Sequence, residues 1–141
     1  MPTTSKKVYL AGDLLYSFVD RNDEKHNQST AFFRYFALEK YHLFTDSYTL
    51  FDIYNRINDD MGLSVAKDFL RTITSSNITL LYPDESDMKA VYKIYLSDRI
   101  SDMTLRQAIM AVLADRRGIP QIATFQYMQT MFGLTVFYIP I

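Results

Sequence analysis

Short apolar runs alternate along this chain with longer segments in which apolar side chains recur every three or four residues. The short runs are 8–10, 42–45, 78–82, 119–124 and 134–138, and each has the length of a strand. Short apolar strands separated by helices are typical of a parallel sheet that is covered by helices on both faces. The pattern therefore predicts an α/β fold.

The longer segments show the 3.6-residue period of amphipathic helices. The predicted helices cover residues 14–19, 29–40, 46–58, 63–73, 86–96, 104–116 and 125–132. The acidic run 84–87 precedes one of them, and we expect it to cap that helix and complement its dipole. Gly118 follows another in a C-cap position. The polar residues 20–27 are predicted to form a loop.

Length and composition bound the class of protein. The chain has 141 residues, of which 48% are hydrophobic and 22% are charged. These values are typical of one globular domain, and no Gly-, Ser- or Pro-rich linker divides the chain. We therefore expect a single domain over residues 1–141.

Charge and residue types exclude several kinds of chemistry. The net charge of −1 gives no overall basic footprint for nucleic acid, although a local patch or a bound cation can still attract it. The absence of cysteine excludes disulfides, thiolate catalysis and cysteine-ligated zinc. His26 is expected to be a solvated loop residue and His42 a structural strand residue. A Gly-x-Ser-x-Gly elbow and glycine-rich phosphate loops are absent from the sequence.

Aromatic content and segment lengths bear on partners and location. The chain has 11 Tyr and 10 Phe, which indicates either an aromatic-rich core or a broad, half-buried surface such as a homodimer interface. No segment approaches the ~20 apolar residues of a membrane span, and the polar start does not have the pattern of a signal peptide. We expect a soluble, cytoplasmic protein that does not enter a membrane.

The strand ends are where the chemistry of such a fold is expected. Ligands of open parallel sheets bind at the carboxyl ends of the strands, near the point where the strand order reverses. In this sequence the candidate ends are residues 11–13, 45–46 and 124–126. Polar side chains in these three segments are therefore the first candidates for a site.

Segments along nearly the whole chain resemble those of PIN domains, the fold of VapC-type toxin ribonucleases. Residues 8–15 (VYLAGDLL) are similar to the first strand and helix of that fold, and residues 43–47 (LFTDS) to its second strand and Thr-Ser loop. Residues 104–108 (TLRQA) match the spacing of its Ser-x-x-Asp-Ala helix, residues 122–126 (IATFQ) resemble its Thr-Phe-Asp strand end, and residues 139–141 fit its last strand. The resemblance implies a three-layer α/β/α sandwich with a mainly parallel central sheet.

The same resemblance implies a nuclease site that this chain has largely lost. A PIN nuclease holds Mg²⁺ or Mn²⁺ with a cluster of three or four acids, because hard cations prefer oxygen ligands and orient the attacking water. The positions that correspond to those acids carry Ala11, Asp52, Gln107 and, after Thr124, Gln126. One carboxylate in four remains on this alignment, so the resemblance is to a degenerate site.

Asp13 is a candidate to replace the carboxylate that is missing at Ala11. It lies two residues after Ala11, so Asp13 and Asp52 together form a weak candidate metal and catalytic pair. Each has a simpler interpretation, Asp13 as a helix N-cap and Asp52 as a solvated helix residue. For Gln107 and Gln126 the favoured interpretation is a satisfied polar pair in a closed pocket.

Three functions remain open. The favoured one is a degenerate PIN-like protein, homodimeric and without a cofactor, that binds RNA or a protein partner without cutting. The second is an active Mg²⁺- or Mn²⁺-dependent endoribonuclease, a toxin of a toxin–antitoxin pair with an altered acidic site; the resemblance then implies an antitoxin as partner. The third is a pure protein-interaction module that never contacts RNA.

Overall fold

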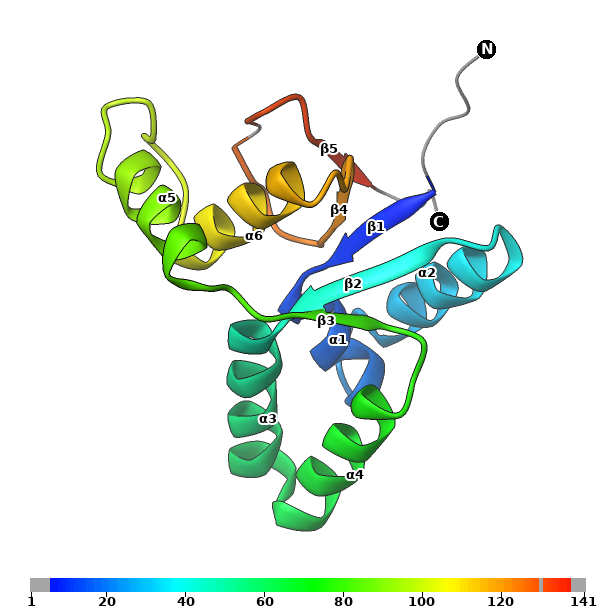
Figure 1. The fold of residues 1–141 in the computed structure, drawn as a ribbon. Coiled ribbons are helices and arrows are strands. Elements are labelled where there is room, and N and C mark those ends of the chain that lie inside the picture. The colour runs from blue at the N-terminus through cyan, green and yellow to red at the C-terminus, as the bar shows by residue number, and fades with distance from the viewer. Residues whose placement is uncertain (1–5, 130, 138–141) are drawn as a thin grey trace.

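Five parallel strands form one sheet at the centre of the molecule (Figure 1). The computed structural model describes residues 6–129 and 131–137. The strands are β1 (Lys7–Leu10), β2 (His42–Asp46), β3 (Thr79–Leu81), β4 (Gln121–Ala123) and β5 (Thr135–Phe137). They lie in the order β3-β2-β1-β4-β5, and every neighbouring pair is parallel. The predicted α/β fold with a parallel sheet is confirmed.

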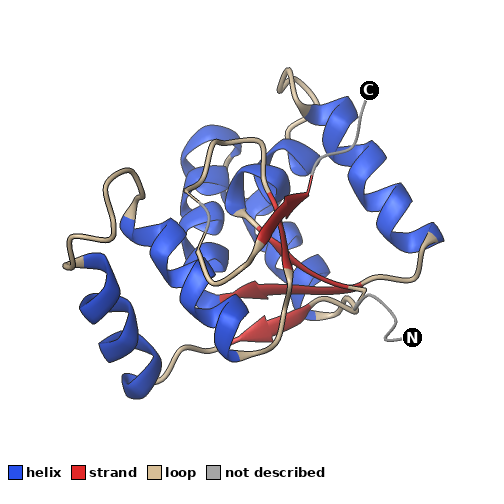
Figure 2. Cartoon of the chain, turned by 90° about the horizontal axis from the view of Figure 1, so that it is seen from above, coloured by secondary structure: helices blue, strands red, loops and turns tan. Residues whose placement is uncertain are grey.

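Helices cover both faces of this sheet. They are α1 (Gly12–Val19), α2 (His26–Leu38), α3 (Ser47–Met61), α4 (Leu63–Thr74), α5 (Glu85–Tyr95) and α6 (Leu105–Arg116). The side chains of β1 alternate between the faces, as the pleat of a strand requires. Figure 1 and Figure 2 show helices on both faces. Val8 and Leu10 contribute to the core under α1–α4, and Tyr9 to the core under α5 and α6. The predicted three-layer sandwich is therefore confirmed.

The helix predicted over residues 125–132 is wrong. The described part of this segment runs as bends and irregular chain between β4 and β5. Phe125 packs against Phe32 on the α1–α4 side, with ring centroids 5.6 Å apart, whereas Met128 is buried in the core on the α5–α6 side. One face of a short helix cannot serve two cores on opposite sides of a sheet, so packing overrides the apparent helical period.

The other predicted elements lie within a few residues of the observed ones. The predicted loop 20–27 is shorter than expected because α2 already begins at His26. Residues 138–141, expected to finish the last strand, lie outside the described residues. Among the described helices, none combines the length and the apolar character needed to cross a bilayer.

A buried carboxylate joins α5 to the end of α6. Asp84 and Asp87 form the capping box of α5, which confirms the predicted role of the acidic run. Asp87 is 1% exposed and accepts hydrogen bonds of 3.1 and 2.7 Å from the guanidinium of Arg117, while Arg116 Nε lies 3.3 Å away. The Arg117 hydrogen bonds lower the pKa of the Asp87 carboxyl to about 2. The basic C-terminal end of α6 is thus bonded to the first turn of α5.

Candidate functional site

The carboxyl ends of β1 and β4 border a pocket of about 170 Å³. The strand order reverses at β1, because β2 lies on one side of it and β4 on the other. Six residues named from the sequence line this pocket: Ala11, Asp13, Asp52, Gln107, Thr124 and Gln126. The structure therefore brings the predicted site residues together.

Asp13 holds the end of β4 in place. Its Oδ2 accepts hydrogen bonds from Thr124 Oγ1 at 2.9 Å and from the backbone N–H of Phe125 at 2.8 Å. Its Oδ1 accepts from the backbone N–H of Leu14 at 2.8 Å. The N-cap of α1 is Ala11, which makes no side-chain cap bond. The interpretation of Asp13 as a helix N-cap is therefore wrong: its carboxylate ties α1 to β4.

Gln107 has its hydrogen bonds satisfied within the protein. Its Oε1 accepts from the backbone N–H of Thr104 at 3.0 Å, and Thr104 Oγ1 accepts from the backbone N–H of Gln107 at 3.1 Å, which completes a capping box on α6. Its Nε2 donates to the carbonyl of Tyr127 at 2.9 Å. Gln126 is exposed. The expected pair of glutamines in a closed pocket is therefore wrong, although Gln107 alone is buried and bonded.

A fully buried carboxylate lies beside the pocket. Asp46 ends β2 and caps α3, with its Oδ1 accepting from the backbone N–H of Thr49 at 2.8 Å. Its Oδ2 accepts from the Tyr9 hydroxyl at 2.5 Å and from Thr49 Oγ1 at 2.9 Å. Burial, and then the nearby charge of Asp46, raise the pKa of the Tyr9 hydroxyl well above its ordinary value. Tyr9 therefore stays protonated and donates to Asp46.

Arg106 reaches from α6 to two carboxylates. Its Nη2 forms an ion pair and hydrogen bond with Asp52 of α3, and its Nη1 lies 4.0 Å from Asp46 Oδ1. Nη1 is buried and has no hydrogen-bond partner. The guanidinium carbon lies 5.5 Å from the centre of the Tyr48 ring. Asp52 is exposed, as expected of a solvated helix residue, but its charge is paired with Arg106.

These contacts decide how the pocket suits a divalent cation. Mg²⁺ and Mn²⁺ require oxygen ligands that are free to coordinate, at least one or two of them carboxylates. Here the oxygens of Asp13 accept hydrogen bonds, Asp52 is paired with a guanidinium, and Ala11 has no side-chain donor atom. Within residues 6–129 and 131–137, no three acidic or histidine side chains converge as a metal site. The donor set does not fit a magnesium or manganese ion.

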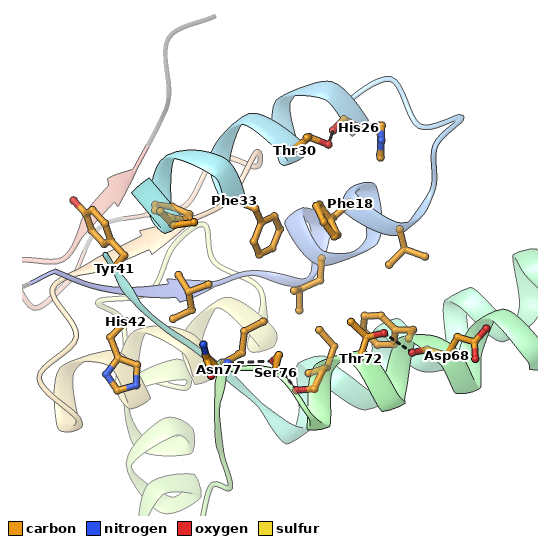
Figure 3. A pocket seen from close by; sticks show the side chains of 18 of the residues that line it. Phe18, His26, Thr30, Phe33, Tyr41, His42, Asp68, Thr72, Ser76 and Asn77 are labelled. Carbon is orange, nitrogen blue, oxygen red and sulfur yellow. Dashed lines mark hydrogen bonds between the residues drawn. The ribbon is translucent and has the colours of Figure 1, made fainter. Parts of the chain in front are cut away.

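A second, larger cavity lies on the face of the sheet that α1–α4 cover, with α1 and α2 on one side and α4 on the other (Figure 3). Its volume is about 980 Å³, and we call it the apolar groove. Figure 3 shows Phe18 and Phe33 side by side, and their ring centroids are 4.5 Å apart. Other apolar residues that line the groove are Leu15, Val19, Phe36, Ala37, Leu43, Val65, Phe69, Ile73 and Ile78. The groove has a far larger volume than the pocket at the strand ends, and Phe18 and Val65 are its exposed large apolar side chains.

The rim of the apolar groove carries more basic than acidic side chains. Arg21 and Lys40 line it and are exposed. Asp68 is the one acid among the described lining residues, and its charge is paired with Arg71 at 2.6 Å. The rim therefore favours a ligand that carries negative charge beside an apolar surface.

Both histidines lie on the same rim (Figure 3). His26 begins α2, and its Nδ1 lies 2.9 Å from the carbonyl oxygen of Ser17. The expectation of a solvated loop residue is wrong for His26, because this bond fixes it between α1 and α2. His42 Nε2 lies 2.8 Å from Thr79 Oγ1 and links β2 to β3, so its predicted structural role is confirmed.

Three features of the site were not predicted from the sequence: the contacts of Arg106, the burial of Asp46 and the apolar groove. One signal was present for Arg106, since a cation in the first turn of a helix lies at the positive end of the helix dipole. The groove left no local signal. Its lining is spread over residues 15–78, and each lining residue alone is typical of an ordinary amphipathic element.

The sequence matches no protein-family model and no curated protein. Solved structures are similar in fold. One is VapC20 of Mycobacterium tuberculosis, described as a sarcin-ricin loop cleaving toxin, with 10% identity, a TM-score of 0.70, and coverage of 82% of this chain and 86% of that chain.

Two further structures are similar over most of their length. VapBC2 of Rickettsia felis, bound to a DNA fragment from its promoter, has 9% identity and a TM-score of 0.65, covering 85% of this chain and 88% of that chain. FitAcB of Neisseria gonorrhoeae has 12% identity and a TM-score of 0.66, covering 92% and 96%. Together the three confirm that the chain has a PIN-like fold.

Proposed function

We propose that this PIN-fold chain is a non-cleaving relative of the VapC-type ribonucleases and acts by holding a protein partner, as a toxin holds an antitoxin. The observation that carries the proposal is the apolar groove of about 980 Å³ between α1, α2 and α4. Concave sites lined mainly by apolar and aromatic side chains are where ligands and partners commonly bind, and Phe18 and Val65 are exposed at this one. The two-component assemblies VapBC2 and FitAcB share the fold and support such a partner.

The groove indicates the chemistry of that partner. Its walls offer aromatic and aliphatic side chains, and its rim offers the positive charges of Arg21 and Lys40. An amphipathic segment with apolar anchors on one face fits such walls. Acidic residues beside those anchors would complement the rim and steer the encounter.

The pocket at the strand ends supports the non-cleaving half of the proposal. A metal-dependent ribonuclease needs carboxylates that are free to hold the ion and to orient water. Here Asp13 is bound to Thr124 and to the backbone of Phe125, and Asp52 is paired with Arg106. Asp13 and Asp52 therefore act in this proposal as structural side chains of the scaffold.

The first test measures cleavage. Purified wild-type chain is incubated with a structured ribosomal RNA fragment and with single-stranded RNA, each with millimolar Mg²⁺ or Mn²⁺. We expect no products above those given by an Asp13→Ala/Asp52→Ala variant. Metal-dependent products from the wild type that this variant loses would contradict the proposal and restore the two-acid nuclease.

The second test measures the affinity of the groove for 8-anilinonaphthalene-1-sulfonate, an anionic aromatic dye that suits an apolar surface with a basic rim. Val65 is exposed on the groove wall, so Val65→Asp places a charge there without touching the core. We expect dye affinity to fall by at least about tenfold, the factor given by 1.4 kcal/mol. Leu63→Asp, on the same helix but outside the groove lining, is the matched control and should bind the dye as the wild type does.

The same pair of variants tests the natural partner. Tagged wild type, Val65→Asp and Leu63→Asp are expressed in the cells from which the chain comes, and the proteins that copurify are identified. We expect one partner with an acidic, amphipathic segment to be retained by the wild type and by Leu63→Asp and lost by Val65→Asp. Equal retention by all three would show that the groove is not the binding surface.

A further inference from the structure

Arg106 occupies an unfavourable place for a cation within its own helix. Thr104 caps α6 and Leu105 is its first residue, so Arg106 lies in the first turn. The free N–H groups of that turn give the helix end a partial positive charge, which disfavours a cationic side chain. The local structure of α6 therefore does not explain this arginine, and its tertiary contacts must offset the cost.

Those contacts are two carboxylates from the β2–α3 segment. Asp46 is fully buried at the end of β2, and Asp52 lies on the exposed side of α3. A buried, ionised carboxylate is costly unless opposite charge and hydrogen bonds compensate it. Among the ion pairs of the described residues, Arg106 is the only cation within 4.0 Å of Asp46.

The orientation of the guanidinium identifies what holds it there. Nη2 is bonded to Asp52, while the buried Nη1 has no hydrogen-bond partner and faces Asp46 Oδ1 at 4.0 Å. A buried N–H without a partner costs free energy. Attraction to the Asp46 charge offsets that cost, because the interaction of two charges is strong where water is excluded.

We propose that the Arg106 guanidinium is the resident cation of the pocket at the strand ends. It lies between Asp46 and Asp52 and balances their charge, as a divalent ion would do between acidic ligands, and it thereby keeps Mg²⁺ and Mn²⁺ out. This inference rests on the proposed loss of metal-dependent cleavage and gives a physical cause for it. The pocket has lost acids and, in addition, Asp46 and Asp52 are neutralised by a side chain of the same chain.

The test removes the charge and keeps the apolar stem. Arg106→Met is compared with the wild type by thermal unfolding and by calorimetric titration, with and without millimolar MnCl₂. We expect the variant to unfold about 5–10 °C lower, because Asp46 is left buried without a counter-charge. Millimolar Mn²⁺ should then raise its unfolding temperature by about 3 °C or more through binding to the folded state, and leave the wild type unchanged.

Two further variants keep this test specific. Arg56 also lines the pocket, but its guanidinium lies 3.6 Å from the centre of the Tyr16 ring, so Arg56→Met should show no response to Mn²⁺. Asp46→Asn keeps an N-cap on α3, because Asn caps helices well. In the Arg106→Met background it removes the uncompensated buried charge but also the oxygen that accepts from Tyr9 and Thr49, so it should restore only part of the lost stability and should abolish the Mn²⁺ response.

Three results would overturn the inference. They are an Arg106→Met variant as insensitive to Mn²⁺ as the wild type, a wild type that binds Mn²⁺ as tightly as the variant, and a Mn²⁺ response that persists when Asp46→Asn is added to Arg106→Met. These results come from unfolding temperatures and heats of binding. The proposed function is judged by RNA products and by groove variants, so either one can fail while the other stands.

Discussion

The pocket at the strand ends and the apolar groove are opposite kinds of cavity on one scaffold. The pocket holds about 170 Å³ and its polar groups are largely paired with one another, whereas the groove holds about 980 Å³ and is lined mainly by apolar side chains. A polar ligand gains little from groups that are already paired. An apolar partner gains from every exposed apolar side chain that it covers. The groove is therefore better suited to binding a partner than the pocket at the strand ends.

The largest loss of stability is expected from removing the hydrogen bonds that Asp13 makes inside the pocket. Asp13→Ala leaves the Thr124 hydroxyl and the backbone N–H of Phe125 without their acceptor. We expect the free energy of unfolding to fall by about 3 kcal/mol, because each donor left buried without a partner costs about 1–3 kcal/mol. Urea unfolding measures this loss. Asp13→Asn retains one acceptor and should lose about half as much; equal stability of Asp13→Ala and the wild type would show that the pocket is not held by these bonds.

Asp87, a buried carboxylate, forms an ion pair with Arg117 outside both cavities. Arg117 lowers the pKa of the Asp87 carboxyl from 3.8 to about 2. Because the folded state holds this carboxyl ionised more strongly than the unfolded state does, its contribution is complete above about pH 4 and is lost as the pH falls towards about 2. We expect about 2 kcal/mol of stability to disappear over that window.

Unfolding of the wild type and of Asp87→Asn at several pH values measures this contribution. The difference in stability between the two proteins should be largest near neutral pH and shrink as the pH falls through the window. A difference that stays constant with pH would contradict the ion pair as its source.

A smaller loss of stability is expected when a carboxylate is introduced into the pocket. Gln107→Glu introduces a carboxylate at the position that the resemblance aligns with an acid of PIN nucleases. One oxygen can still accept from Thr104, but the other replaces an N–H that donates to the Tyr127 carbonyl and would face that oxygen. We expect a loss of about 1–2 kcal/mol in urea unfolding, the cost of a buried polar group without its partner. Gln126→Glu, at an exposed position, is the control and should change stability by less than about 0.5 kcal/mol.

The smallest effect is expected in the groove. Thr72 lines it and is exposed, so Thr72→Val should change the free energy of unfolding by less than about 0.5 kcal/mol. The added methyl group should increase the affinity for 8-anilinonaphthalene-1-sulfonate about two- to threefold, since a buried CH₂ contributes about 0.8 kcal/mol when fully covered. Thr74→Val removes a similar hydroxyl bond to the helix backbone outside the groove lining and should leave dye affinity unchanged.

Local pattern was sufficient for most of the fold. The alternation of Val8, Tyr9 and Leu10 and the period of α3 or α4 arise from side-chain geometry within one element. Such patterns are visible in a sequence because each buried face needs its apolar residues at fixed spacing. The one predicted helix that is absent, over residues 125–132, failed because Phe125 and Met128 pack on opposite sides of the sheet.

The membership of the candidate site was also predictable, because the carboxyl ends of parallel strands converge whatever the residues are. The resemblance to PIN domains located Ala11, Gln107 and Gln126 at positions that line the pocket. Their contacts were not predictable. Asp13 was expected to cap its own helix and instead bonds to Thr124, more than 100 positions later in the chain.

The layers, the parallel sheet and the place of the pocket could be predicted, because the period of each element and the alternation of strands with helices are carried by neighbouring residues. The pairing of the charges and the exposure of apolar surface depend on tertiary contacts. Arg106 pairs with Asp46 and Asp52, more than 50 positions earlier in the chain. Phe33 of α2 and Phe69 of α4 line the same groove although they are far apart in the sequence. Pairing and exposure depend on distances in space, which no local pattern encodes.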